Sequence, residues 1–120
     1  MKFKHDKPKV KVTSEQKADV WHFRLIKVNR YKNSEIGKLE IDFAREKKYF
    51  VISSHVDTIY RNNGFGKLLY VKALKKFGKL KTDYFEASED AQRVWISLCK
   101  KYKSKKFFFY GTLTLYNKLK

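Results

Sequence analysis

The sequence has little of the chemistry that stabilises secreted or metal-bound proteins. It contains one cysteine, Cys99, and therefore no internal disulfide; this is typical of a reducing compartment. Its three histidines lie at spacings unrelated to those of zinc ligands. No run of about 18 apolar residues is present, so no membrane span is expected, and the basic start lacks the apolar core of a signal peptide. We therefore expect a cytoplasmic protein that does not bind membranes.

Acidic residues are also scarce. Lys and Arg number 29 against 12 Asp and Glu, which gives a net charge of +17. Such a charge attracts polyanions, and each phosphate contact makes binding salt-dependent. Nucleic acid and acidic proteins are therefore candidate partners. The lysines are spread along the whole chain, so the charge indicates which partners the protein attracts but not which reaction it catalyses.

What the sequence does contain is enough for one core. A length of 120 residues with 42% apolar and 17% aromatic content is typical of a single ordered domain. Residues 1–9 alternate lysine with polar residues and include the only proline, Pro8. We assign 1–9 to a flexible basic arm and 10–120 to the domain.

Hydrophobic periodicity outlines the strands. Segments in which apolar and polar residues alternate predict strands with one buried face, and Tyr49–Val56 is more continuously apolar, which favours a central position. The polar stretch Thr13–Asp19 is interpreted as a turn, or as one helical turn capped by Ser14. The predicted strands are Val10–Val12, Val20–Val28, Ile36–Phe43, Tyr49–Val56, Leu80–Ala87 and Phe107–Tyr116.

Two helices interrupt this pattern. Apolar residues at a spacing of about four follow Gly64–Gly66 and predict a helix that ends at Gly78, a typical C-cap. Ser88 is a good N-cap for a second helix, whose first turn contains Glu89 and Asp90. Its apolar stripe is Ala91, Val94, Trp95, Leu98 and Tyr102.

The order β, β, β, β, α, β, α, β predicts an α/β fold. We expect a single domain with a mixed, mostly antiparallel twisted sheet, a central parallel pair and two main helices. The strand–helix–strand unit around the glycines requires a right-handed crossover.

The most informative segment lies between the fourth strand and the first helix, and reads Arg61-Asn62-Asn63-Gly64-Phe65-Gly66-Lys67. A helix start presents unpaired N–H groups and the positive end of the dipole, which together hold a phosphate. A side chain at either glycine would keep a phosphate from the backbone and disfavour positive φ. The spacing fits neither a P-loop nor a dinucleotide fingerprint. A tight turn into a helix is the simpler alternative.

Arg61-x-x-Gly64-x-Gly66 resembles the (Arg/Gln)-x-x-Gly-x-(Gly/Ala) pyrophosphate loop of the GNAT superfamily of N-acetyltransferases. Residues 56–70 look like that family's strand 4, loop and helix 3, and residues 87–95 are similar to its passage from strand 5 to helix 4. Together these segments place the resemblance over residues 36–116, about two thirds of the chain. The resemblance implies a GNAT-like domain.

The resemblance also implies acetyl-CoA as the cofactor and acetyl transfer to an amine, of a protein or other macromolecule. The pyrophosphate would lie on the backbone of Asn62, Asn63, Gly64, Phe65 and Gly66, with Arg61 and Lys67 beside it. N–H groups near Ser54 and Val56 would polarise the thioester carbonyl. Short domains of this kind also occur in bacteriophage genomes, which would place the protein in the host cytoplasm.

A base must take the proton of the attacking amine. Strand position makes Glu86 and Glu40 candidates, with His55 and Asp57 as weaker ones. Residues of each of these kinds are more often simply solvated strand residues.

The chain departs from the family pattern in three places. The segment between strands 1 and 2 shrinks to Thr13–Asp19, which opens the acceptor site. Trp95 stands where many members have a tyrosine that protonates the leaving thiolate, so Tyr102, Tyr84 or water would have to serve. Phe50 stands where some members keep a glutamate base.

Two alternatives therefore remain open. One is a basic, aromatic nucleic-acid-binding module, in which the outward face of Phe107–Tyr110 stacks on bases. The other is a catalytically inactive GNAT-like binding protein. Cys99, Trp95 and Trp21 are interpreted as packed residues.

Overall fold

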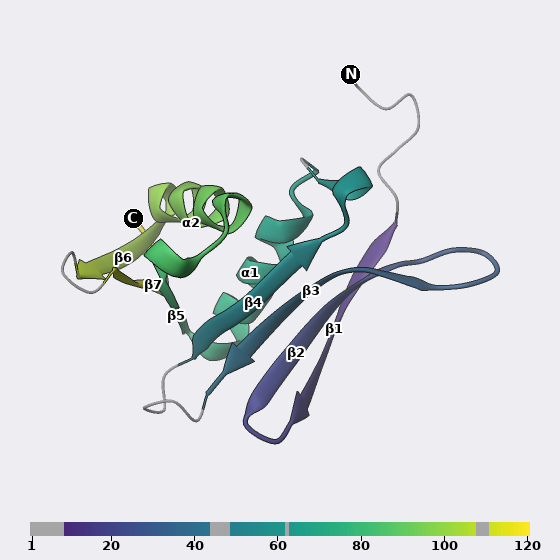
Figure 1. Cartoon of the computed structure of the whole chain (residues 1–120), viewed down its shortest axis with the longest axis horizontal. Helices are drawn as coiled ribbons and strands as arrows, with labels where there is room; N and C mark the ends of the chain where they lie inside the picture. Colours follow the sequence, from purple (N-terminus) through teal and green to yellow (C-terminus); the bar gives the residue numbers. More distant parts are fainter. Residues whose placement is uncertain (1–8, 44–48, 62, 108–110) are drawn as a thin grey trace.

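A single mixed sheet runs through the molecule, with two helices packed against it (Figure 1). The computed structural model describes residues 9–43, 49–61, 63–107 and 111–120. In this part of the chain seven strands lie in the order β1-β2-β3-β4-β5-β7-β6. The strands are β1 Val10–Lys17, β2 Val20–Lys27, β3 Ser34–Asp42, β4 Phe50–Val56, β5 Lys79–Asp83, β6 Tyr102–Phe107 and β7 Thr112–Leu119; the helices are α1 Phe65–Phe77 and α2 Glu89–Lys101.

The predicted fold class is confirmed as a mixed-sheet α/β domain with two main helices. β1 to β4 pair antiparallel in sequence order, and β4 and β5 are the parallel neighbours. Both helix caps are as predicted: Ser88 accepts a hydrogen bond from the Ala91 N–H at 3.2 Å, and Gly78 ends α1 at φ 83°. Most of the predicted arm, residues 1–8, lies outside the described residues.

The first strand is longer than its sequence suggests. Thr13–Asp19 was expected to form a turn, but β1 continues through Lys17, and the chain reverses at Ala18 with φ 52°. The polar residues pair along β2 instead, with Thr13 opposite Arg24. An Arg24–Glu15 ion pair of 2.9 Å lies across these two strands. Polar residues are compatible with this edge strand because its outer face meets solvent.

The C-terminal part also differs from expectation. The single strand predicted over 107–116 is a hairpin, because β6 begins directly after α2 and the chain turns at Gly111, whose φ is 66°. Residues 108–110 lie outside the described part. The strand predicted over 80–87 ends at Asp83 and is followed by a 3-10 turn at Tyr84–Glu86.

The core lies between one face of the sheet and the two helices. Alternate residues of β2 and β3 point to α1, as the period of a strand requires. Trp95 is fully buried, as predicted, whereas Trp21 is half-buried at the edge and packs edge-to-face on Phe77 at 5.6 Å. The main core side chains are Phe23, Leu25, Leu39 and Ile41 from the sheet, Leu69, Tyr70, Ala73 and Leu74 from α1, and Trp95 and Leu98 from α2.

The parallel neighbours β4 and β5 stay together for a very short distance. Their single paired position is Phe50 opposite Lys81, and the Lys81 N–H donates to the Tyr49 carbonyl at 2.8 Å. Just beyond it, the register between β3 and β4 shifts, so that Ile52 has no opposite residue in β3. A bulge of this kind bends its strand and ends regular pairing. β4 and β5 therefore separate toward the end of β4 that precedes α1.

Neither helix of the described residues is long or apolar enough to cross a membrane.

Candidate functional site

Two pockets meet in the opening between β4 and β5. The first, of about 380 Å³, lies beside the N-terminal ends of α1 and α2. The second, of about 620 Å³, lies between the start of β4 and the turn that follows β5. Both are lined by Ser54, Tyr70, Ser88 and Ala91. A ligand held in the first pocket can therefore present one end to a second ligand held in the other.

The start of α1 faces the first pocket without a side-chain cap. Gly64 occupies the N-cap position at φ 78°, and the first turn contains no acidic residue. The first hydrogen bond within the helix runs from the Leu68 N–H to the Gly64 carbonyl at 2.9 Å. The N–H groups of Phe65, Gly66 and Lys67 precede that bond, so they have no acceptor within the helix. Together with the helix dipole they form a partial positive charge that suits an anion.

The two glycines serve different purposes. Position 64 favours glycine because its backbone is in the left-handed conformation. Space is not the reason, since a Cβ there would meet nothing within 4 Å. Gly66 is helical, and a Cβ there would meet the Val94 side chain at an ordinary 3.5 Å. The expectation that positive φ requires both glycines therefore holds for Gly64 alone. At Gly66 the missing Cβ leaves the backbone N–H more accessible, and the Val94 and Val56 side chains lie within 4 Å of the position that a Cβ would occupy.

Cationic side chains border the same pocket. Lys67 Nζ donates to Ser97 Oγ at 3.0 Å, which holds the ammonium between α1 and α2. Arg61 Nε donates to the Val56 carbonyl at 2.9 Å, and its Nη1 lies 3.2 Å from an Asp90 oxygen. These contacts keep both cations at the pocket wall, although Asp90 offsets part of the positive charge.

A tyrosine and a serine meet where the two pockets join. The Tyr70 hydroxyl donates to Ser54 Oγ at 2.9 Å. Burial raises the pKa of Tyr70, and the hydrogen bond with Ser54 partly offsets this effect. The Trp95 ring packs edge-to-face on Tyr70 with centroids 5.2 Å apart, and its buried N–H has no hydrogen-bond partner in the described part of the chain. Tyr70 is thus a protonated group at neutral pH.

The structure brings most of the predicted binding residues together. Asn62 lies outside the described residues, and the Asn63 amide donates to the Tyr60 and Arg61 carbonyls at 3.0 and 3.2 Å, which stabilises the loop. Seven of the predicted residues line the first pocket: Ser54, Val56, Arg61, Gly64, Phe65, Gly66 and Lys67.

The predicted catalytic residues are more scattered. Glu86 is exposed in the turn after β5 and lines the second pocket. Glu40 lines neither pocket, because it lies on the charged outer face of β3, 3.2 Å from His22 and 3.7 Å from Lys38. Tyr102 is 4% exposed at the far end of α2, where it packs in the core and lines neither pocket. Of these three residues, Glu86 alone is placed beside the opening.

The weaker candidates His55 and Asp57, the alternative acid Tyr84, and Tyr70, which was not among the candidates, remain to be placed. His55 lines the first pocket and lies 3.1 Å from Asp57, with both side chains about half exposed. Tyr84 lines a separate pocket. Tyr70, by contrast, is one of the residues at helical spacing after Gly64–Gly66, and the sequence pattern therefore assigns it to packing. The available signal was its position four residues after Gly66, since residues at i and i+4 share a helix face.

Comparisons with known proteins add one finding about the fold. No protein-family profile matches the chain, and no curated protein matches it significantly by sequence. Among solved structures, the chain is similar to a domain from Methanocaldococcus jannaschii known from its crystal structure. The TM-score is 0.54 at 11% identity, over 82% of this chain and 66% of that one, just under two thirds of its length. Likeness at this identity concerns the fold alone.

Proposed function

We propose that the protein is an acetyl-CoA-dependent N-acetyltransferase of the GNAT type, acting on an amine of a protein or other macromolecule. The observation that carries this proposal is the uncapped, basic start of α1 at the mouth of an opening between two parallel strands. The pyrophosphate-loop resemblance of residues 61–66 supports it from the sequence. The two pockets that meet in the opening provide one place for each substrate.

The start of α1 would hold the pyrophosphate. Its three outward N–H groups and the Lys67 ammonium provide donors and positive charge on one side of the first pocket. Charge-assisted hydrogen bonds of this kind are the strong ones. Nothing in the helix competes for these donors. A Cβ at Gly64 would meet nothing within 4 Å, whereas one at Gly66 would make ordinary contacts with the Val94 and Val56 side chains.

The exposed edge of β4 would hold the thioester. The Asp57 N–H bonds to the Ile36 carbonyl, which belongs to β3. Because successive backbone groups of a strand point to opposite sides, Val56 and Ser54 direct theirs away from β3, into the opening. The Val56 carbonyl does accept a hydrogen bond there, from Arg61. The N–H groups of Ser54 and Val56 are therefore available to polarise a carbonyl oxygen.

Proton transfers would use groups on both sides of the junction. Acetyl-CoA, when bound, supplies an acetyl group activated as a thioester. Glu86, at the second pocket, is positioned to accept a proton from an amine. The Tyr70 hydroxyl carries a proton where the pockets meet, so it takes the acid role for which the sequence offered Tyr102 or Tyr84.

Calorimetric titration with acetyl-CoA and with CoA tests the cofactor site. Nucleic acid is removed first, because a chain of charge +17 binds polyanions. Gly66→Glu places a carboxylate at the helix start and is expected to weaken binding at least about tenfold, or roughly 1.4 kcal/mol. Gly66→Ala is the control for folding, because its methyl group makes an ordinary contact. It is expected to weaken acetyl-CoA binding less than Gly66→Glu, because it adds no negative charge. Lys72→Gln controls for the change in net charge on an exposed part of the same helix.

The same variants separate the alternatives. An enzyme loses acetyl-CoA binding and acetyl transfer with Gly66→Glu. An inactive binding protein loses binding but shows no transfer in the wild type with any amine tested. A nucleic-acid-binding module is unaffected by Gly66→Glu and loses affinity with rising salt. The aromatic face invoked for that module falls largely on residues 108–110, outside the described part.

A further inference from the structure

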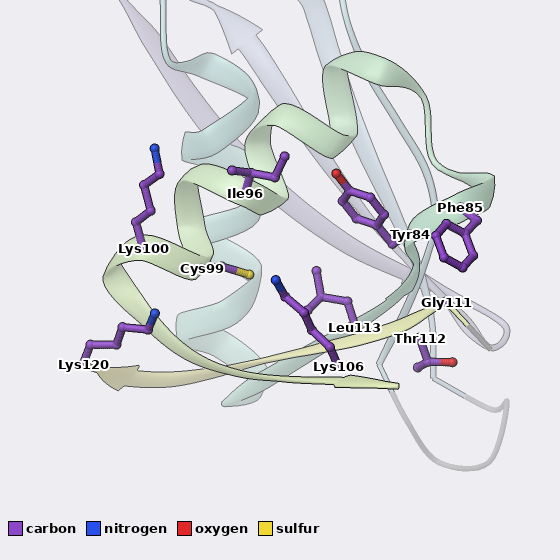
Figure 2. Close-up of a pocket in the computed structure, with 10 residues that line it drawn as sticks. All are labelled: Tyr84, Phe85, Ile96, Cys99, Lys100, Lys106, Gly111, Thr112, Leu113 and Lys120. Carbon is purple, nitrogen blue, oxygen red and sulfur yellow. The ribbon is translucent and has the colours of Figure 1, made fainter. Parts of the chain in front are cut away.

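A third pocket lies on a different face of α2 and shares no lining residue with the other two. It has a volume of about 500 Å³ and lies between α2, the β6–β7 hairpin and the turn after β5 (Figure 2). This volume falls within the range of about 300–1,000 Å³ that is usual for small-molecule sites. The proposed acetyl transfer gives this pocket no role.

The walls of this pocket are largely apolar. Tyr84, Phe85, Ile96 and Leu113 contribute rings and branched chains. Two of these large side chains are unusually accessible, with Phe85 67% and Ile96 48% exposed. Exposed apolar side chains around a concavity indicate a surface that something apolar covers.

The end of the pocket at Phe85 is fixed by packing. A Cβ on Gly111 would lie 2.3 Å from the Phe85 ring, so the ring rests directly on the glycine backbone. The Tyr84 N–H donates to the Gly111 carbonyl at 2.8 Å, which ties the turn after β5 to the start of β7. The exposed ring is thus held in place as part of the wall rather than left free in solvent.

Positive charge lies at one side of this apolar space. Lys100, Lys106 and Lys120 line the pocket, and no acidic residue does. Within the described residues, none of these lysines lies at ion-pair distance from a carboxylate. Figure 2 shows the Lys106 ammonium and the Cys99 thiol pointing into the space between α2 and the hairpin. An apolar space with uncompensated cations at its border is complementary to a hydrocarbon chain that ends in an anion.

We propose that this pocket binds a medium-chain carboxylate, with the hydrocarbon chain against Ile96 and Leu113 and the carboxylate on Lys106. The apolar walls supply affinity in proportion to the area removed from water, and the lysine selects the charged end. The proposal is independent of acetyl-CoA binding, because no residue of the first two pockets takes part.

Cys99 provides a direct readout, because it is the only cysteine of the chain and lines the pocket. Decanoate, at concentrations below micelle formation, is expected to slow alkylation of Cys99 by iodoacetamide in a saturable manner. Decanol is expected to protect at least about tenfold less well, which corresponds to the loss of one charge-assisted contact. Decylammonium is expected not to protect. Equal protection by all three compounds would overturn the carboxylate assignment.

Two pairs of variants locate the ligand. Ile96→Glu places a carboxylate in the pocket and is expected to abolish decanoate binding measured by calorimetry, whereas Ile59→Glu, at another exposed isoleucine, leaves it intact. Lys106→Ala is expected to weaken decanoate binding about tenfold without affecting decanol, whereas Lys103→Ala on the same strand has no effect. Equal effects of Lys106→Ala and Lys103→Ala would overturn the proposal.

Two further controls separate this pocket from the acetyl-CoA site and from a membrane-binding surface. Gly66→Glu, which disrupts the proposed acetyl-CoA site, is expected to leave decanoate binding unchanged, so failure of one proposal is distinguishable from failure of the other. Binding to vesicles of phosphatidylglycerol without binding of monomeric decanoate would assign the surface to a membrane and overturn the proposal.

Discussion

The two helices of this protein begin in opposite ways. At the start of α2, Ser88 accepts a hydrogen bond from the Ala91 N–H, and Glu89 and Asp90 lie in the first turn. At the start of α1, a glycine replaces the cap, no acidic residue is present, and Lys67 lies in the first turn. A capping side chain stabilises a helix by about 1 kcal/mol, and a favourable first-turn charge adds roughly 0.3–1 kcal/mol. α2 has both contributions and α1 has neither.

The start of α2 is therefore stabilised by its own side chains, whereas the N-cap residue of α1 provides no side-chain acceptor for the N–H groups. Both helix starts border the same pocket, so solvent exposure alone does not explain why one is capped and the other is not. The N–H groups at the start of α1 have no capping side chain, which is what the proposed pyrophosphate site requires. An uncapped helix start next to a capped one is a stronger indication of an anion-binding site than a glycine or a helix start alone.

The largest expected effect comes from giving α1 the charge of α2. Lys67→Glu is expected to weaken binding of acetyl-CoA by about 10- to 100-fold, because it replaces an attractive cation by a repulsive carboxylate and removes a charge-assisted contact. The free energy of unfolding is expected to change by no more than about 0.5 kcal/mol, since an acidic residue in the first turn favours the helix. Calorimetry and urea denaturation measure the two quantities on the same sample.

Ser97→Ala is the control for this variant. It removes the acceptor of the Lys67 hydrogen bond but leaves the charge in place, so affinity should fall much less than with Lys67→Glu. Unchanged affinity in Lys67→Glu would show that the start of α1 is a simple turn into a helix.

The next effect concerns Tyr70, which lies where the two pockets meet. Tyr70→Phe removes the hydroxyl bonded to Ser54 and is expected to lower the free energy of unfolding by about 1–2 kcal/mol, because a partly buried partner loses its hydrogen bond. If Tyr70 supplies the proton to the leaving group, acetyl transfer falls while acetyl-CoA affinity is largely kept. Ser54→Ala is the matched variant, since it breaks the same bond but leaves the phenol.

The stability difference has a defined pH dependence. Burial raises the pKa of Tyr70 in the folded state above its ordinary value of 10.0. Above that pH the unfolded chain releases the tyrosine proton while the folded chain retains it, so the unfolded state is favoured. The contribution of Tyr70 is therefore complete below pH 10 and declines as the pH rises further. Denaturation curves of wild type and Tyr70→Phe at pH 8 and at alkaline pH should differ accordingly; a constant difference would contradict this account.

A smaller effect is expected from removing the cap of α2. Ser88→Ala should lower the free energy of unfolding by about 1 kcal/mol, and Ser88→Gly by a few tenths. Both variants lose the acceptor for the Ala91 N–H, but glycine lets water reach the helix end in its place, whereas the methyl group of alanine hinders it. Urea denaturation measures both. A loss as large in Ser88→Gly as in Ser88→Ala would mean that water does not replace the lost cap at this helix end.

Much of this contrast was predictable from sequence. The caps at Gly78 and Ser88, the acidic first turn of α2 and the glycines before α1 follow from local chemistry, because each depends on residues within one turn. The grouping of the loop residues in one pocket was expected from the resemblance of residues 61–66 to a pyrophosphate loop.

The parts that depend on distant neighbours were not predictable. β1 extends through polar residues because β2 offers a complete ladder. β6 shows no alternation of apolar and polar residues that would distinguish it from the end of a helix. Its strand conformation depends on its pairing with β7. Tyr70 has the spacing of a core residue, and its role depends on Ser54, 16 residues earlier on β4. Glu40 was favoured by strand position, but it lies on the outer face of β3 beside His22 and Lys38 and does not line the opening.

The smallest expected effect tests whether the two helix starts are coupled. Arg61 of the α1 loop lies 3.2 Å from Asp90 in the first turn of α2, and both side chains are more than one third exposed. Exposed pairs of this kind contribute about 0.2–1 kcal/mol. A double-mutant cycle with Arg61→Ala and Asp90→Ala should therefore give a coupling energy in that range, measured by urea denaturation at low salt. Asp90→Ala alone should improve acetyl-CoA affinity, because it removes a carboxylate that competes with the phosphates for Arg61. If affinity falls instead, the ion pair serves to position Arg61, and the capped start of α2 then supports the uncapped start of α1 rather than merely lying beside it.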